Sequence, residues 1–75
     1  MPFIDIKVIQ GVFTPEEKRE LVERVSETAI AVEGEALRPY TTTAITETPS
    51  GEWAVGGRPY TADDVKAARS TSATV

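Results

Sequence analysis

The sequence contains neither cysteine nor histidine. Thiol nucleophiles, Ser-His-Asp chemistry, structural zinc and ordinary transition-metal sites are therefore excluded, unless a partner chain supplies the missing residues. Any catalytic base must be a carboxylate, an amine or the chain terminus. The chain is also short, with 75 residues, so we expect it to rely on partner copies to bury enough apolar surface.

Basic residues and long apolar runs are scarce as well. Eight Lys and Arg residues stand against 12 Asp and Glu residues, which gives a net charge of −4. This balance argues against binding to nucleic acid or to an anionic membrane. No apolar run approaches the roughly 18 residues of a membrane span, and the first residues lack the pattern of a secretory signal. We therefore expect a cytoplasmic protein.

The first half of the chain predicts a strand followed by a long helix. Residues Phe3 to Ile9 alternate with a period of two and are rich in β-branched side chains, which is typical of a half-buried strand. Thr14, Pro15 and Glu17 form the pattern of a capping box, so a helix is expected from Pro15 to near Gly34. Apolar residues at spacings of three and four predict its inward face: Leu21, Val22, Val25, Ala29 and Val32.

The second half predicts a further strand and a short helix. The threonine-rich run from Tyr40 to Thr48 is interpreted as a strand, so a strand, a crossover helix and a strand form a right-handed βαβ unit with parallel strands. Trp53 to Val55 is a short apolar segment that ends at a Gly-Gly pair, and Thr61 is expected to cap a helix that runs through about Arg69.

These elements predict one small α/β domain over residues 1–69 and a frayed tail over residues 70–75. A two-stranded sheet with one helix leaves one face and both edges uncovered. We therefore expect the chain to oligomerise, so that other copies cover the open face and edges of the sheet and complete the small βαβ fold.

Pro2 is the residue with the most distinctive chemistry. A proline directly after the initiator methionine favours removal of Met1, which would expose a secondary amine at the start of a strand. Such an amine takes a proton from carbon when an apolar site and neighbouring cations lower its pKa, because both disfavour its charged form. If Met1 is retained, the Pro2 nitrogen is an amide and cannot act as a base.

Several short motifs occur together in one order: Pro2 before an apolar strand, a break at Gly11, the helix start Thr14 to Lys18, the strand end Ile45 to Glu47 and the segment Gly51 to Gly57. In this combination the chain resembles the 4-oxalocrotonate tautomerase family of the tautomerase superfamily over about residues 2 to 60. The resemblance implies βαβ protomers that assemble as a trimer of dimers. It also implies a tautomerase that uses no cofactor and acts on a small enol or 2-oxo acid.

The resemblance also assigns roles to residues. Pro2 matches the general base of the family, and Trp53 matches the aromatic residue that lines its pocket. The two usual active-site arginine positions are substituted, by Val12 and Thr42. Two other arginines are candidates for binding the carboxylate of the substrate, with surface ion pairing as their alternative role: Arg38 and Arg58.

The substituted arginines keep two other functions open. One is a non-catalytic structural or regulatory subunit that retains the fold and associates with a catalytic partner chain in a hetero-oligomer. The other is a hydratase or dehalogenase of the same superfamily, in which Asp5 and Glu47 are the candidates for activating water.

Overall fold

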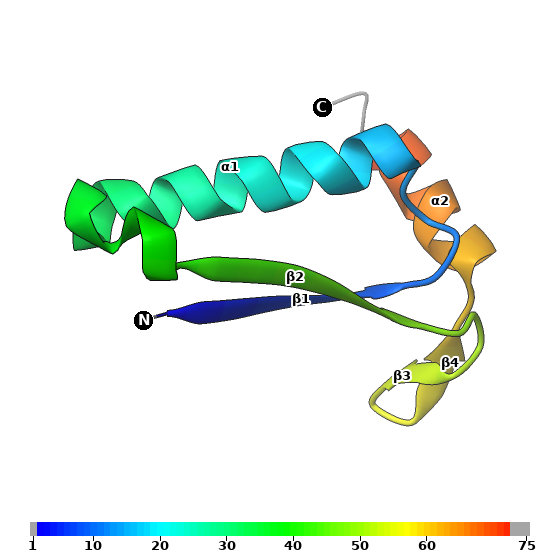
Figure 1. Cartoon of the computed structure of the whole chain (residues 1–75). Coiled ribbons are helices and arrows are strands. Elements are labelled where there is room, and N and C mark those ends of the chain that lie inside the picture. The colour runs from blue at the N-terminus through cyan, green and yellow to red at the C-terminus, as the bar shows by residue number, and fades with distance from the viewer. Residues whose placement is uncertain (1, 73–75) are drawn as a thin grey trace. The chain divides into compact units, whose positions relative to one another are not determined.

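The computed structural model of the chain describes residues 2–72 and contains the strand, helix, strand order that the sequence predicts (Figure 1). The first half consists of strand β1 (Phe3–Ile9), helix α1 (Pro15–Glu33) and strand β2 (Thr42–Thr48). The capping box at the start of α1 is present as predicted. The backbone N–H of Glu17 donates to the Thr14 hydroxyl at 3.1 Å, and the backbone N–H of Thr14 donates to the Glu17 carboxylate at 3.0 Å.

Strands β1 and β2 are hydrogen-bonded neighbours in a two-stranded sheet. At one end of the pair the backbone N–H of Thr42 donates to the Pro2 carbonyl at 3.1 Å, and at the other end the N–H of Gln10 donates to the Thr48 carbonyl at 2.7 Å. The first residues of both strands therefore lie together, as do their last residues, so the strands are parallel. A parallel pair joined by α1 is the predicted βαβ unit.

The second strand begins later than the sequence predicted. Residues Glu35–Tyr40 form a short 3-10 helix, η1, and β2 starts at Thr42 rather than at Tyr40. Gly34 ends α1 with a φ of 110°, a backbone conformation that favours glycine. Pro39 has no N–H to donate to a sheet, which is consistent with its place in η1 rather than in a strand.

A β-hairpin follows, where the sequence predicted only a short apolar segment, Trp53 to Val55, that ends at a Gly-Gly pair. Strands β3 (Trp53–Val55) and β4 (Arg58–Tyr60) are antiparallel, with Trp53 opposite Tyr60 and Val55 opposite Arg58. The two turn glycines, at positions 56 and 57, have φ values of 59° and 83°. Positive φ at both central residues is the requirement of the tight hairpin turn that best matches strand twist.

Helix α2 spans Ala62–Ser72 and is longer than predicted. Thr61 caps it as expected: the backbone N–H of Asp64 donates to the Thr61 hydroxyl at 3.1 Å, and the N–H of Thr61 donates to the Asp64 carboxylate at 2.9 Å. Residues 70–72, which the sequence analysis assigned to a frayed tail, belong to α2, and the remainder of that predicted tail lies outside the described residues.

Packing within the chain divides it into two compact units. One unit consists of the residues up to Ile6 together with Thr14–Thr46, and the other consists of Lys7–Phe13 together with the residues from Glu47 onward. Ile30 is the buried apolar residue of the first unit at 4% exposure, and two residues of the second unit are similarly buried: Ile9 at 5% and Val12 at 6%. The prediction of a single domain over residues 1–69 stays a prediction.

The inward face of α1 differs from the prediction at its end. Val32, which was placed on that face, is 87% exposed, whereas Ile30 is buried. Residues two apart on an α-helix point about 200° apart, so Ile30 and Val32 cannot both face the same neighbour. In the folded chain Ile30 is the one of the two that packs inward.

Within residues 2–72, no helix combines the length and the apolar character that crossing a membrane requires.

Candidate functional site

Pro2 lies directly before β1 and is half-buried. Its carbonyl accepts the hydrogen bond from the backbone N–H of Thr42, so the sheet holds this residue through its main chain. A residue held in this way has little freedom to turn away from a ligand. The hydrogen bond therefore gives Pro2 the fixed position that a general base needs.

Trp53 lines an apolar pocket in the second unit, with a volume of about 190 Å³. We call it the Trp53 pocket, and the described residues that line it come from the end of β1, the turn after it, β3 and α2: Lys7, Val8, Ile9, Val12, Phe13, Trp53 and Val65. An engineered apolar cavity of about 150 Å³ holds a benzene molecule. The Trp53 pocket is therefore large enough for a ring or a short unsaturated chain.

Arg58 lies on β4, two residues before the residue that faces Trp53 across the hairpin. Alternate residues of a strand share a face, so Arg58, Tyr60 and Trp53 lie on the same face of the hairpin. The Arg58 guanidinium lies 4.7 Å from the centre of the Tyr60 ring and donates a hydrogen bond to the Tyr60 hydroxyl at 3.2 Å. This arrangement holds a cation on the Trp53 side of the hairpin.

Arg69 was not among the predicted site residues, yet it contacts two residues of the Trp53 pocket. Its guanidinium lies 4.9 Å from the centre of the Phe13 ring and donates to the Val12 carbonyl at 3.2 Å. Arg69 and Val12 are separated by 57 positions in the sequence. The local sequence shows only that Arg69 is a basic residue in the last turn of a helix. Such a residue commonly stabilises the helix dipole, so its position alone does not indicate a site.

Arg38 lies on η1 rather than on a strand, and it makes four hydrogen bonds to two carboxylates. It donates to Glu27 at 2.6 and 3.0 Å and to Glu35 at 2.8 and 2.9 Å. These bonds occupy nearly all of its N–H donors. A substrate carboxylate that binds Arg38 in the bidentate manner must therefore displace at least one of them.

The same ion pairs make stability depend on pH. Hydrogen bonds from Arg38 lower the pKa values of Glu27 and Glu35 below 4.5, and the two carboxylates raise the pKa of Arg38. A carboxylate whose pKa is depressed in the folded state stabilises the protein above its unfolded pKa, and this contribution is lost as the pH falls through the folded pKa.

We therefore expect Arg38→Gln to lower the urea midpoint at neutral pH, with a difference from the wild type that shrinks as the pH falls below 4.5. Urea unfolding of both proteins across the acid range measures this. Arg24→Gln, which removes an exposed pair with Glu20 at 2.9 Å, is the matched control for the loss of one positive charge. A difference that grows toward low pH would contradict the prediction.

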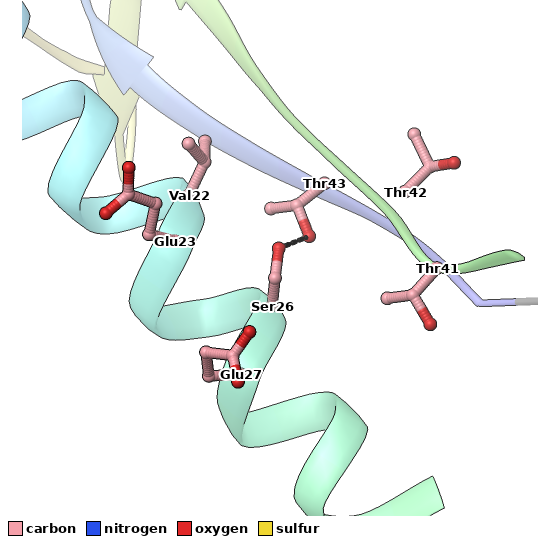
Figure 2. Close-up of a pocket in the computed structure, with 7 residues that line it drawn as sticks. All are labelled: Val22, Glu23, Ser26, Glu27, Thr41, Thr42 and Thr43. Atoms are coloured by element: carbon pink, nitrogen blue, oxygen red, sulfur yellow. Dashed lines mark hydrogen bonds between the residues drawn. The ribbon is translucent and has the colours of Figure 1, made fainter. Parts of the chain in front are cut away.

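A second pocket, of about 430 Å³, lies in the first unit between α1 and the start of β2 (Figure 2). Figure 2 shows Ser26 of α1 and Thr43 of β2 facing each other, and the Ser26 hydroxyl donates to the Thr43 hydroxyl at 2.6 Å. Two carboxylates, Glu23 and Glu27, line this pocket, and none of its described lining residues is basic. This pocket is therefore poorly suited to binding a ligand that carries a carboxylate, because the two glutamates would repel it.

The two residues considered for water activation, Asp5 and Glu47, lie on β1 and β2. The Asp5 carboxylate accepts a hydrogen bond from the Thr46 hydroxyl at 2.7 Å, and Glu47 is exposed on β2. Among residues 2–72 there is no group of His, Cys, Asp and Glu side chains that could hold a metal ion.

Comparison with known proteins identifies similar sequences and structures. A family model described as tautomerase enzyme matches residues 2–63. The crystal structure of apo unfused 4-OT is similar with a TM-score of 0.69 and 35% identity, over 84% of this chain and 97% of that one. DmpI from Helicobacter pylori is similar with a TM-score of 0.66 and 32% identity, over 77% of this chain and 94% of its own.

TomN, described as a 4-oxalocrotonate tautomerase homologue in the tomaymycin biosynthetic pathway, extends the coverage to 93% of this chain and 95% of its own, with a TM-score of 0.63 and 27% identity. No curated protein sequence matches the chain.

Proposed function

The chain belongs to the tautomerase enzyme family, as its motifs predicted, and we propose that it is a tautomerase that interconverts the keto and enol forms of a small 2-oxo acid without a cofactor. The observation that carries the proposal is the family match from Pro2 through the Trp53 hairpin to residue 63. The match includes the candidate base and the aromatic residue of the apolar pocket.

In the proposed mechanism the Pro2 nitrogen, freed of Met1, removes a proton from one carbon of the substrate and returns it to another. The amine must be neutral to accept the proton, so its pKa has to lie near the working pH. Apolar surroundings and nearby cations both lower the pKa of an amine, because each destabilises its protonated form. We propose that the apolar walls beside Trp53 and the guanidinium of Arg58 supply these two conditions to the Pro2 nitrogen of a neighbouring protomer.

The carboxylate of the substrate requires a cation, and the predicted candidates differ in availability. Arg58 stacks on Tyr60 on the Trp53 face of the hairpin, so we propose it as the carboxylate ligand of the two. Arg38 forms ion pairs with Glu27 and Glu35 in the single chain. For Arg38 to bind the substrate carboxylate, that carboxylate has to replace one of these glutamates.

Pro2 precedes the first residue of β1, whereas Val8 and Ile9 at the end of this strand line the Trp53 pocket, and Pro2 is not among the lining residues. We propose that the base of one protomer acts on a ligand bound at the pocket of another, in the trimer of dimers that the family resemblance implies.

Exposed apolar side chains support the proposed homo-oligomer. Phe3 on β1 is 68% exposed in the single chain, and three further large apolar residues are also exposed: Val32, Tyr40 and Val55. A domain of this size gains stability when partner copies bury such residues.

The direct test of the proposed base is covalent labelling with an electrophilic analogue of a 2-oxo acid. We expect the analogue to attach to the Pro2 nitrogen and the tautomerase rate to fall in proportion to the labelled fraction, because a substituted amine no longer accepts the proton. Intact-mass measurement and peptide mapping locate the label. Protein that retains Met1 is the control and should stay unlabelled at Pro2. Full activity after complete labelling would rule out this base.

A non-catalytic subunit in a hetero-oligomer is the second candidate function. The observation that favours it is the burial of Val12, which is 6% exposed at one position where the resemblance calls for an arginine. Uniform retention of Met1 in the purified protein would support this function, since the Pro2 nitrogen would then be an amide. Removal of Met1 from the protein would argue for the tautomerase.

A further inference from the structure

The charges at the Trp53 pocket differ from those of the chain as a whole. The chain carries a net charge of −4. Lys7 lines the pocket, the Arg69 guanidinium contacts two other lining residues, and none of the described lining residues is acidic. An acidic protein that gathers two cations at an apolar pocket provides local complementarity to an anion with an apolar body.

Helix α2 places Arg69 there through one continuous face. Ala62, Val65 and Arg69 follow one another at spacings of three and four, so they lie on the same side of the helix. Val65 lines the pocket. Ala62 packs against the turn after β1, where a Cβ added at Gly11 would lie 3.6 Å from the Ala62 Cβ.

Arg69, at the other end of this helix face, also contacts the turn after β1. It binds the Val12 carbonyl at 3.2 Å and stacks on the Phe13 ring, both of which belong to the same turn. A guanidinium that donates to a main-chain carbonyl and stacks on a ring has its planar fork oriented in advance, which reduces the entropy lost when it binds a carboxylate. Arg69 also lies beyond residues 2–63, the part that the family model matches.

We propose that Arg69 is a specificity-determining residue of the Trp53 pocket, and that it selects small unsaturated or aromatic carboxylates over neutral ligands of the same shape. The proposal rests on the tautomerase function proposed above, because it assigns the ligand preference of the same site. The pocket volume of about 190 Å³ matches a body of about one aromatic ring. The guanidinium at its margin binds the carboxylate through charge-assisted hydrogen bonds.

Binding of benzoate and benzamide tests this preference. The two probes share a ring and a planar head group, and they differ in the negative charge. Trp53 is the one tryptophan of the sequence, so its fluorescence reports occupation of the pocket directly. We expect the wild type to bind benzoate at least about tenfold more tightly than benzamide, with a ratio that falls as salt is added.

Arg69→Gln is expected to lower the ratio at least about threefold, with the remaining preference due to Arg58, while the affinity for benzamide changes by less than about twofold. Arg69→Lys is expected to retain part of the preference, because it keeps the charge without the fork. Arg24→Gln is the matched control: it removes the same charge from an exposed pair with Glu20 on α1, and the ratio should remain that of the wild type.

Three outcomes would overturn the proposal. Equal loss of both probes in Arg69→Gln and Arg69→Lys would mean that Arg69 supports the pocket by packing. A wild-type ratio in Arg69→Gln would place the selectivity elsewhere, for example at Arg58. Failure of benzoate to bind the wild type would show that the pocket takes no such ligand.

These measurements require no turnover, so their outcome is independent of the role of Pro2. If Pro2 proves not to be the base, the binding ratios still decide the role of Arg69. If Arg69 proves irrelevant to the ratio, a tautomerase rate that depends on Pro2 still stands.

Discussion

Replacing Pro2 with alanine is expected to lower kcat/KM for the ketonisation of an enol 2-oxo acid by about a hundredfold or more, the range typical for loss of a positioned general base. An N-terminal alanine carries a primary amine, which lacks the ring that holds the proline nitrogen in one orientation. The main-chain hydrogen bond from Thr42 to the carbonyl of residue 2 can still form, so the sheet itself should persist. The rate difference then reports the amine rather than the fold.

The measurement compares initial rates of proteins whose intact mass shows that Met1 is absent. Pro49→Ala is the matched control, since it makes the same substitution at an exposed internal proline in the turn before the hairpin. We expect this control to retain the wild-type rate. Equal rates for the wild type and Pro2→Ala would contradict the proposed mechanism, and the non-catalytic subunit would then be the better hypothesis.

Ile30→Ala is expected to lower the free energy of unfolding by about 2–5 kcal/mol, the range for truncating a buried isoleucine. Ile30 is 4% exposed. A domain is commonly stable by only about 5–15 kcal/mol, so this single change removes a large share of the total. The loss combines the transfer of apolar atoms from water with the cavity left behind.

Val32→Ala is the matched control, because it removes methyl groups from the same helix at a site that is 87% exposed. In the single chain its effect should stay within about 0.5 kcal/mol. Urea unfolding is measured at a fixed protomer concentration, since assembly makes stability depend on concentration. A larger loss for Val32→Ala than for Ile30→Ala would contradict the assignment of the inward face. It would indicate instead that Val32 is buried in an interface between protomers.

Local chemistry explains the parts of the fold that were predicted well. Thr14 and Glu17 satisfy each other's backbone N–H groups, so the start of α1 is determined within four residues of sequence. Thr61 and Asp64 do the same for α2. The bounds of β1 follow from side-chain alternation, and the family resemblance that the motifs indicated is confirmed by the match over residues 2–63.

Predictions were less accurate where tertiary packing decides the conformation or the burial of a residue. Tyr40 has a good strand propensity, but it belongs to η1, which is followed by β2 from Thr42. Ile30 and Val32 are equally apolar, and packing decides which of them is buried. Neither choice is encoded in a window of a few residues, because each depends on what lies opposite the helix or strand.

The candidate site shows the same division. The sequence by itself determined that the base must come from a carboxylate, an amine or the terminus, that Pro2 precedes a strand and that Trp53 is the aromatic residue before a glycine turn, because these follow from composition and local order. The tertiary structure decided the surroundings of the cations. It ties Arg38 to Glu27 and Glu35 and brings Arg69 to Val12 across 57 positions. Such contacts join residues whose separation along the chain carries no periodic or local signal, so they exist only once the chain is folded.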